Sequence, residues 1–136
     1  MKLAFVCVQN AGRSQMAAAF AERERVERGL DSIELVTGGT HPAEEVHPEV
    51  IDTMRELDVD ISNREPRAVS TAELETCDVV ATMGCSTLDL DAATDVRDWA
   101  LADPHGRSPE RVREIRDEVR AKVTGLFDEI TADGTT

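Results

Sequence analysis

One stretch decides how the rest of the chain is interpreted: Cys7-Val8-Gln9-Asn10-Ala11-Gly12-Arg13-Ser14. The apolar run before it, residues 3–8, is typical of a fully buried strand, and residues 14–29 predict a helix that ends at Gly29. A loop that turns from a strand into a helix N-terminus can bind an oxyanion through backbone N–H groups and the helix dipole. The sequence therefore predicts an oxyanion-binding loop made of Val8, Gln9, Asn10, Ala11, Gly12, Arg13 and Ser14.

Two side chains of this stretch can carry chemistry. Arg13, six positions after Cys7, can close the loop as a bidentate clamp on an oxyanion. The same positive groups favour the thiolate form of Cys7, which is the nucleophilic form of a cysteine. The Cys-X5-Arg spacing of such a P-loop is a weak signal by itself, but the flanking strand and helix, Gly12 and the hydroxyl of Ser14 make it specific. We expect Cys7 and Arg13 to be catalytic.

The composition limits the class of protein. A chain of 136 residues can form one domain with its own core, and we expect residues 1–136 to be a single catalytic domain. The net charge of −13 argues against nucleic acid or an anionic membrane as a partner. The apolar start of the chain is too short for a signal peptide, and no later stretch approaches a membrane span. We therefore expect a cytoplasmic protein whose cysteines are thiols.

The balance of charged residues bears on the working environment. Asp and Glu number 28 against 15 Lys and Arg, and the only lysines are Lys2 and Lys122. Acid-rich, lysine-poor surfaces resemble those of proteins from salt-loving organisms. Molar salt shortens the Debye length to about 3 Å, which would suppress repulsion between acidic groups and let an oxyanion approach. We interpret the protein as halophilic, with an ordinary acidic surface as the alternative.

Strands and helices alternate along the chain. Periodicity and turn residues predict strands at 33–37, 78–83 and 96–99, an extended piece at 58–62, and helices at 48–57, 70–76 and 108–130. The apolar positions of the helix at 14–29 include Met16, Phe20 and Val26. Alternation of this kind implies parallel pairing through right-handed crossovers, and hence a three-layer α/β sandwich.

Three loops of this sandwich are expected to meet. Ligands bind to such sheets beyond the carboxyl ends of the strands. Cys7, Cys85 and Asp103 each lie in a loop that follows a predicted strand. We therefore expect them at one edge of the sheet.

Two longer stretches resemble a known family. Residues 5–19, Phe-Val-Cys-Val-Gln-Asn-Ala-Gly-Arg-Ser-Gln-Met-Ala-Ala-Ala, and residues 98–106, Asp-Trp-Ala-Leu-Ala-Asp-Pro-His-Gly, resemble the low-molecular-weight protein tyrosine phosphatase superfamily. They are more similar to its arsenate reductase branch, as is the helical segment 113–120. The resemblance covers nearly the whole chain and implies a four-stranded parallel sheet flanked by helices.

The resemblance also implies a role for each matched residue. Cys7 would be the nucleophile, Arg13 the oxyanion clamp and Asp103 the general acid. Ser14 would hydrogen-bond the thiolate, and Asn10 would hold the loop in shape. General chemistry supports these roles, because a thiolate attacking phosphorus or arsenic needs donors for the developing charge and a proton for the departing oxygen.

Two activities share that first step. In a phosphatase, water then attacks the cysteinyl phosphate, whereas in a reductase a thiol attacks Cys7, releases arsenite and leaves a disulfide. Phosphatases of this superfamily usually stack aromatic side chains on the phosphotyrosine ring. This chain has only three Phe, one Trp and no Tyr, so we favour arsenate reductase. A low-molecular-weight phosphatase that hydrolyses phosphomonoesters is the alternative. An anion-binding sensor or scaffold is disfavoured, because Cys7, Arg13 and Asp103 are all present.

The thiol that attacks Cys7 is left open. Cys85 resembles the first of two resolving cysteines in thioredoxin-coupled arsenate reductases, but Asp91 and Ala92 stand where the second is expected. Either Cys85 attacks Cys7 and forms a disulfide with it, or an external thiol attacks Cys7 directly. Because of the first possibility, we count Cys85 among the candidate catalytic residues. The reductant would be thioredoxin, glutaredoxin or a small cellular thiol, with no bound cofactor.

We expect no required metal. The acidic residue of the potassium site in the related reductases is replaced by Ala18. His41, His47 and His105 show no metal-ligand spacing and are interpreted as loop histidines, although His105 is a candidate substrate contact. Cys77, just before a predicted buried strand, is interpreted as structural.

Overall fold

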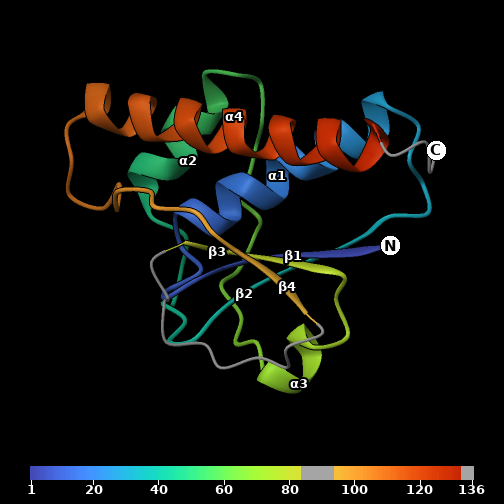
Figure 1. The fold of residues 1–136 in the computed structure, drawn as a ribbon. Coiled ribbons are helices and arrows are strands. Elements are labelled where there is room, and N and C mark those ends of the chain that lie inside the picture. The colour runs from blue at the N-terminus through green and yellow to red at the C-terminus, as the bar shows by residue number, and fades with distance from the viewer. Residues whose placement is uncertain (84–93, 133–136) are drawn as a thin grey trace.

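The computed structural model describes residues 1–83 and 94–132, and its centre is a parallel sheet. The described strands are β1 (Lys2–Cys7), β2 (Glu34–Gly39), β3 (Val79–Met83) and β4 (Asp95–Asp98). Their order is β2-β1-β3-β4, and every neighbouring pair is parallel. From β2 on one side of β1 the chain crosses to β3 on the other side, so the strand order reverses at β1 (Figure 1).

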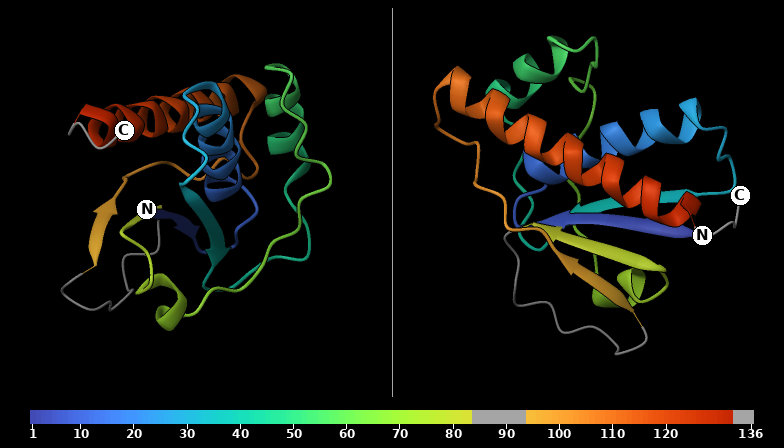
Figure 2. Two further views of the ribbon diagram at one scale, coloured as in Figure 1. Left: turned by 90° about the vertical axis from the view of Figure 1, so that its right-hand side faces the viewer. Right: turned by 45° about the horizontal axis from the view of Figure 1, so that its top comes forward.

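The helices are divided unequally between the two faces of the sheet. The described helices are α1 (Arg13–Glu27), α2 (Pro48–Arg55), α3 (Thr71–Leu74) and α4 (Pro109–Ala132). α1, α2 and α4 cover one face, and the short α3 lies on the other (Figures 1 and 2). The predicted α/β fold with a four-stranded parallel sheet is confirmed. None of the helices in the described ranges combines the length and the apolarity that a membrane crossing requires.

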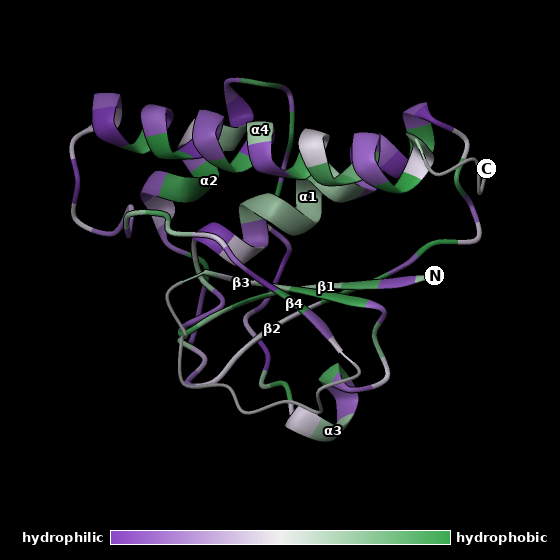
Figure 3. Cartoon of the chain, in the orientation of Figure 1, coloured by the Kyte–Doolittle hydropathy of each residue, from purple (hydrophilic) through white to green (hydrophobic). Residues whose placement is uncertain are grey.

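The alternation of side chains along β1 explains the two unequal layers. Leu3, Phe5 and Cys7 belong to the large cluster under α1 and α4, whereas Ala4 and Val6 belong to the small cluster with α3. Figure 3 shows the hydrophobic stripe of α4 turned towards α1 and the sheet. The residues predicted for this stripe are buried except for the partly buried Ile130: Val112, Ile115, Val119, Val123, Leu126 and Phe127.

Two predicted details of the elements are wrong. Val26, expected at an apolar position of the first helix, is 72% exposed, because the buried part of α1 ends at Ala21 and the charged end of the helix lies at the surface. The extended piece predicted at 58–62 does not begin at Asp58. Asp58 has a positive φ of 61° and its N–H donates to the carbonyl of Arg55, so the chain turns there after α2.

Candidate active site

The loop after β1 lies at the carboxyl edge of the sheet, where the strand order reverses. Cys7 is the last residue of β1, and in the register it lies between Gly39 of β2 and Met83 of β3. α1 begins at Arg13, and no side chain in the described part of the molecule caps its first turn. Ligands bind to α/β sheets at such a reversal, and an uncapped helix N-terminus presents unpaired N–H groups. The predicted loop therefore lies where an anion can be held.

The close approach of β2 to this loop requires a glycine. A Cβ on Gly39 would lie 2.5 Å from the carbonyl oxygen of Val8 and 3.0 Å from the backbone nitrogen of Asn10. Both contacts are with backbone, which cannot move aside as a flexible side chain can. Gly39 therefore allows the segment after β2 to run along the loop.

That segment, residues 40–47, holds the carbonyl groups of the loop. Its backbone N–H groups donate bonds of 2.8–3.3 Å to loop carbonyls, in the pairs Thr40–Cys7, His41–Val8, Ala43–Gln9 and His47–Ala11. A trans peptide directs the carbonyl of one residue and the N–H of the next to opposite sides. The N–H groups of Val8, Gln9, Asn10 and Gly12 therefore face the inner side of the loop. One of them, that of Asn10, donates to Cys7 Sγ at 3.2 Å.

Asn10 fixes the curvature of the loop. Its φ of 52° lies in the left-handed region, which asparagine tolerates better than most residues. Its buried side chain makes four hydrogen bonds: Nδ2 donates to Ser14 Oγ (2.7 Å) and Thr37 Oγ1 (2.9 Å), and Oδ1 accepts from Gln15 Nε2 and the N–H of Arg67 (both 3.0 Å). Breaking any of them would leave a buried polar group unpaired, so the amide holds the loop rigidly.

The sulfur of Cys7 is surrounded by donors. Because Ser14 Oγ accepts from Asn10 Nδ2, its own hydrogen is free to donate to Cys7 Sγ, 2.8 Å away. The N–H of Asn10 is the second donor. Cys7 is only 3% exposed, so these groups, together with the positive end of the α1 dipole, take the place of water around a thiolate.

Cys7 opens into a pocket of about 230 Å³. The lining residues are Cys7, Val8, Gln9, Gly12, Arg13, His47 and Asp103. The structure thus brings together Cys7, Arg13 and Asp103, which come from both ends of the chain. In the lining that the structure describes, the only ring is the imidazole of His47.

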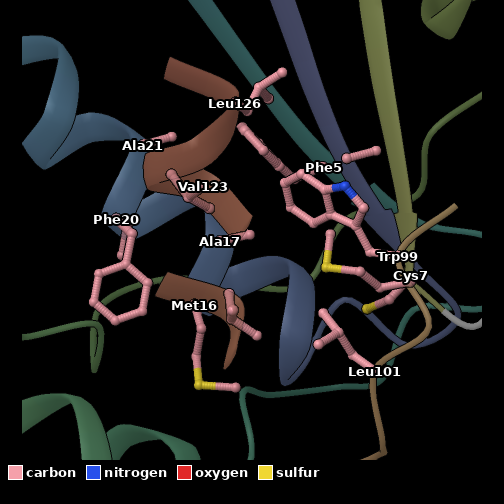
Figure 4. Packing of buried hydrophobic residues seen from close by; sticks show 14 of the residues in the cluster. Phe5, Cys7, Met16, Ala17, Phe20, Ala21, Trp99, Leu101, Val123 and Leu126 are labelled. Carbon is pink, nitrogen blue, oxygen red and sulfur yellow. The ribbon is translucent and has the colours of Figure 1, made fainter. Parts of the chain in front are cut away.

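The loop that carries Asp103 contacts the first loop directly. Arg13 Nη1 donates to the carbonyl oxygen of Leu101 at 2.9 Å. A Cβ on Gly12 would lie 3.1 Å from Pro104 Cγ, so the two loops are in contact there as well. Asp103 is exposed, and its Oδ1 accepts a bond of 3.0 Å from the N–H of His105, which orients the carboxylate. Figure 4 shows Trp99 and Leu101 packed beside Phe5 and Cys7, which anchors the start of this loop in the core.

Three predicted loop residues do not line the pocket. Asn10 and Ala11 of the loop, and Ser14 at the start of α1, are completely buried and support the loop from within. Cys85 lies outside the described residues. Cys77 is a buried free thiol whose pKa is raised by its burial, which agrees with a structural interpretation.

His41, His47 and His105 lie in loops, as predicted, but His47 and His105 make contacts that the sequence did not indicate. His47 lines the pocket, and its Nε2 lies 3.1 Å from Gln9 Oε1. The rings of His47 and His105 stack with centroids 4.1 Å apart, and His105 Nδ1 lies 3.1 Å from Glu49 Oε1. Burial, and then the neighbouring His105, lower the pKa of His47, so its neutral form is favoured. The sequence could have indicated the position of His47 near the site. The segment 40–47 follows β2, and parallel strands all end at the same edge of a sheet.

Comparisons with known proteins agree with this geometry. The family model described as low molecular weight phosphotyrosine protein phosphatase matches residues 2–136. A Halobacterium salinarum protein named "Putative arsenate reductase" is 65% identical over 134 residues, which are 97% of this chain and 94% of that protein. A Synechocystis protein named glutaredoxin arsenate reductase is 34% identical over 134 residues, which are 96% and 98% of the two chains.

A solved structure supports the same relationship. The thioredoxin-dependent arsenate reductase of Corynebacterium glutamicum is 30% identical and gives a TM-score of 0.81. The match covers 97% of this chain and 62% of that longer one. Because the family model extends over nearly the whole sequence and the relatives share both sequence and fold, the chain belongs to the low molecular weight phosphotyrosine protein phosphatase family.

Proposed function

We propose that this protein is an arsenate reductase with Cys7 as its nucleophile and an external thiol system as its reductant. The observation that carries the proposal is the sulfur of Cys7, which accepts two hydrogen bonds beside a pocket that Arg13 and Asp103 also line. The activity named for the Halobacterium and Synechocystis relatives supports it.

In the first step, the Cys7 thiolate attacks the arsenic atom of arsenate, so that an As–S bond forms and one As–O bond breaks. The inward N–H groups of the loop and the Arg13 guanidinium bind the remaining oxygens, on which negative charge grows. The guanidinium has five N–H donors, and the bond to Leu101 occupies one of them. Two of the remaining four can bind the oxyanion together. The departing group is a hydroxyl of arsenate, and Asp103 gives it a proton so that it leaves as water.

In the second step, a thiol attacks the sulfur of Cys7. An S–S bond forms, the electron pair of the S–As bond stays on arsenic, and arsenite leaves. A second thiol opens this disulfide and restores Cys7. Two thiols are thereby oxidised to one disulfide while arsenic gains two electrons, so the reaction needs no bound cofactor.

The reductant is proposed to attack Cys7 directly, with Cys85 as the competing resolving thiol. Of the relatives named above, one is called a glutaredoxin arsenate reductase and another a thioredoxin-dependent arsenate reductase. Glutaredoxin, thioredoxin or a small thiol can therefore act as the reductant in the second step. A Cys85→Ser variant should keep full arsenate reduction with low-molecular-weight thiols. Loss of that activity would instead assign the first attack to Cys85.

A phosphatase is the second candidate function, because the first step is the same with phosphorus in place of arsenic and the family includes phosphatases. The pocket argues for the smaller substrate. Trp99 is 8% exposed and packs on Phe5, with ring centroids 6.0 Å apart, so it is not available to stack on a phosphoaryl ring.

Paired assays on one preparation test the proposal. One assay follows arsenite formation from arsenate with a thiol reductant, and the other follows phosphate release from an aryl phosphate, each repeated with Cys7→Ser. We expect thiol-dependent arsenate turnover that disappears in Cys7→Ser, with little phosphate release. Efficient phosphate release without arsenate reduction would make the protein a phosphatase, and turnover that survives Cys7→Ser would refute the proposed nucleophile.

The setting of the reaction is part of the proposal. A thiol-dependent cycle requires a reducing compartment, so we assign the protein to the cytoplasm. The net charge of −13 opposes both folding and the approach of an oxyanion, and dissolved salt screens both effects. Activity and the unfolding midpoint should therefore rise with KCl concentration. Full activity and unchanged stability in dilute buffer would contradict a halophilic protein.

A further inference from the structure

Three side chains at the mouth of the pocket form a cluster that the proposed reaction does not use. His47 occupies the N-cap position of α2, Glu49 lies in the first turn of that helix, and His105 lies in the loop after Asp103. One ligand atom from each of the three lies within 4.8 Å of the others. The cluster therefore joins two segments that are far apart in the sequence.

We infer that His47, Glu49 and His105 bind a divalent transition-metal cation such as Zn²⁺. Two imidazoles and one carboxylate are a ligand set that zinc takes in proteins, with a fourth position left to water. The cation would replace the hydrogen between His105 Nδ1 and Glu49 Oε1, which now lie 3.1 Å apart.

The geometry needs only a small adjustment to accept the cation. Bonds of about 2.0–2.1 Å in a tetrahedral arrangement put ligand atoms about 3.3 Å apart. The ligand atoms lie within 4.8 Å of one another, so no pair has to close by more than about 1.5 Å. Rotation of the two stacked imidazoles and of Glu49 can supply this movement, because Glu49 and His47 are half-buried and His105 is exposed. His47 is held from outside the cluster by Gln9 Oε1 at 3.1 Å, an outer partner of the kind that orients metal-binding imidazoles.

The charges favour a cation over a second oxyanion. The carboxylate of Glu49 belongs to the cluster, and Asp103 lines the same pocket as His47. The Glu49 carboxylate would repel an anion at this point, whereas Arg13 binds the oxyanion of the proposed reaction. Magnesium should bind poorly, because it prefers oxygen ligands in octahedral geometry to imidazole nitrogen.

Calorimetric titration of Zn²⁺ into the full-length protein tests the inference. A Cys7→Ser/Cys85→Ser parent removes two thiols that would also bind zinc, and Cys77 is buried. We expect one site in this parent, weakened about tenfold or more in His105→Ala and in His47→Ala. His41→Ala is the matched control, since His41 is an exposed histidine outside the cluster, and it should bind zinc as the parent does.

A second measurement protects the test against misfolding. Zinc should raise the unfolding midpoint of the parent and of His41→Ala, and Mg²⁺ should not. The exposed His105→Ala variant should keep the metal-free midpoint and lose the zinc-dependent rise. No binding in the parent, or binding of the same strength in His105→Ala and His47→Ala, would overturn the inference.

Discussion

The two loops that meet at the pocket are held in different ways. The loop of residues 8–12 is held by hydrogen bonds in the interior, and the buried side chain of Asn10 alone makes four hydrogen bonds. The loop that carries Asp103 lies at the surface and is joined to the rest by Arg13, by Pro104 against Gly12, and by the His105–Glu49 contact.

Because of this difference, substitutions in the two loops should affect stability and activity differently. Damage to the buried bonds of the first loop leaves polar groups unpaired in the interior, which lowers stability and disorganises the nucleophile together. Removing the exposed carboxylate of Asp103 from the second loop breaks no buried bond, so it should lower activity alone. The predictions that follow test this separation.

The largest effect is expected for Asn10→Ala. The substitution removes four hydrogen bonds, two buried and two part-buried, and puts alanine at a φ of 52°. We expect the free energy of unfolding to fall by about 2–4 kcal/mol and arsenate turnover to fall about 1,000-fold, since the donors around Cys7 lose their positions. Urea unfolding and steady-state kinetics measure the two quantities.

Asn10→Gly is the matched control for that prediction. Glycine tolerates the positive φ but also lacks the side chain, so it should recover about 1 kcal/mol of stability and little of the activity. Recovery of full activity in Asn10→Gly would show that the hydrogen bonds of the amide are unimportant.

Asp103→Asn should affect activity alone. The amide oxygen can still accept from the N–H of His105, but the side chain has no proton to give to the leaving oxygen. Turnover should fall about 100-fold, while the free energy of unfolding stays within about 0.5 kcal/mol of the unchanged protein. A loss of stability comparable with that of Asn10→Ala would remove the distinction between the loops.

A smaller effect is expected where the loops contact each other. In Gly12→Ala the new Cβ would lie 3.1 Å from Pro104 Cγ and push the Asp103 loop outward by a few tenths of an ångström. We expect kcat/KM to fall about threefold to tenfold with little change in the unfolding midpoint. The double variant Gly12→Ala/Pro104→Ala removes the contacting Cγ and should recover most of the loss; equal activity in the single and double variants would exclude this contact as the cause.

The sequence predicted the first loop better than the second because its signals are local. A buried strand, a tight turn and a helix start follow one another between residues 3 and 16, so Cys7 and Arg13 could be assigned to one site without any distant contact. The roles given to Asn10 and Ser14 came from the family resemblance. The structure adds their partners, such as Thr37, which comes from β2 and has no local signal.

What sequence reasoning missed depends on contacts between distant segments. The segment 40–47 holds the carbonyls of the first loop, but its sequence resembles any polar turn region. His47 and His105 stack only because α2 and the Asp103 loop pack at the same edge. Val26 was misjudged for a related reason, since a helical apolar position is buried only where another element covers it.

The smallest effect on stability is expected for α2, the helix that contacts the second loop. Glu49, which contacts His105, lies on α2, and Glu56 at the end of α2 accepts hydrogen bonds from Arg113 and Arg116 of α4, each with a shortest distance of 2.8 Å. These guanidinium groups, Arg113 first, lower the pKa of Glu56 from 4.5 to about 2. Because the folded-state pKa is depressed, the ion pair stabilises the protein above about pH 4.5, and this contribution is lost as the pH falls towards 2.

Glu56→Gln measures this contribution. The difference between the urea midpoints of the unchanged protein and the variant should be constant from neutral pH to about pH 5, shrink below the ordinary pKa of 4.5, and vanish near pH 2. It should be small throughout, because exposed ion pairs stabilise proteins little. Glu45→Gln, which changes an exposed glutamate in the turn before α2, is the matched control for the loss of one negative charge. A Glu56→Gln difference that persists unchanged at pH 2 would mean that its cause is helix packing and not the ion pair.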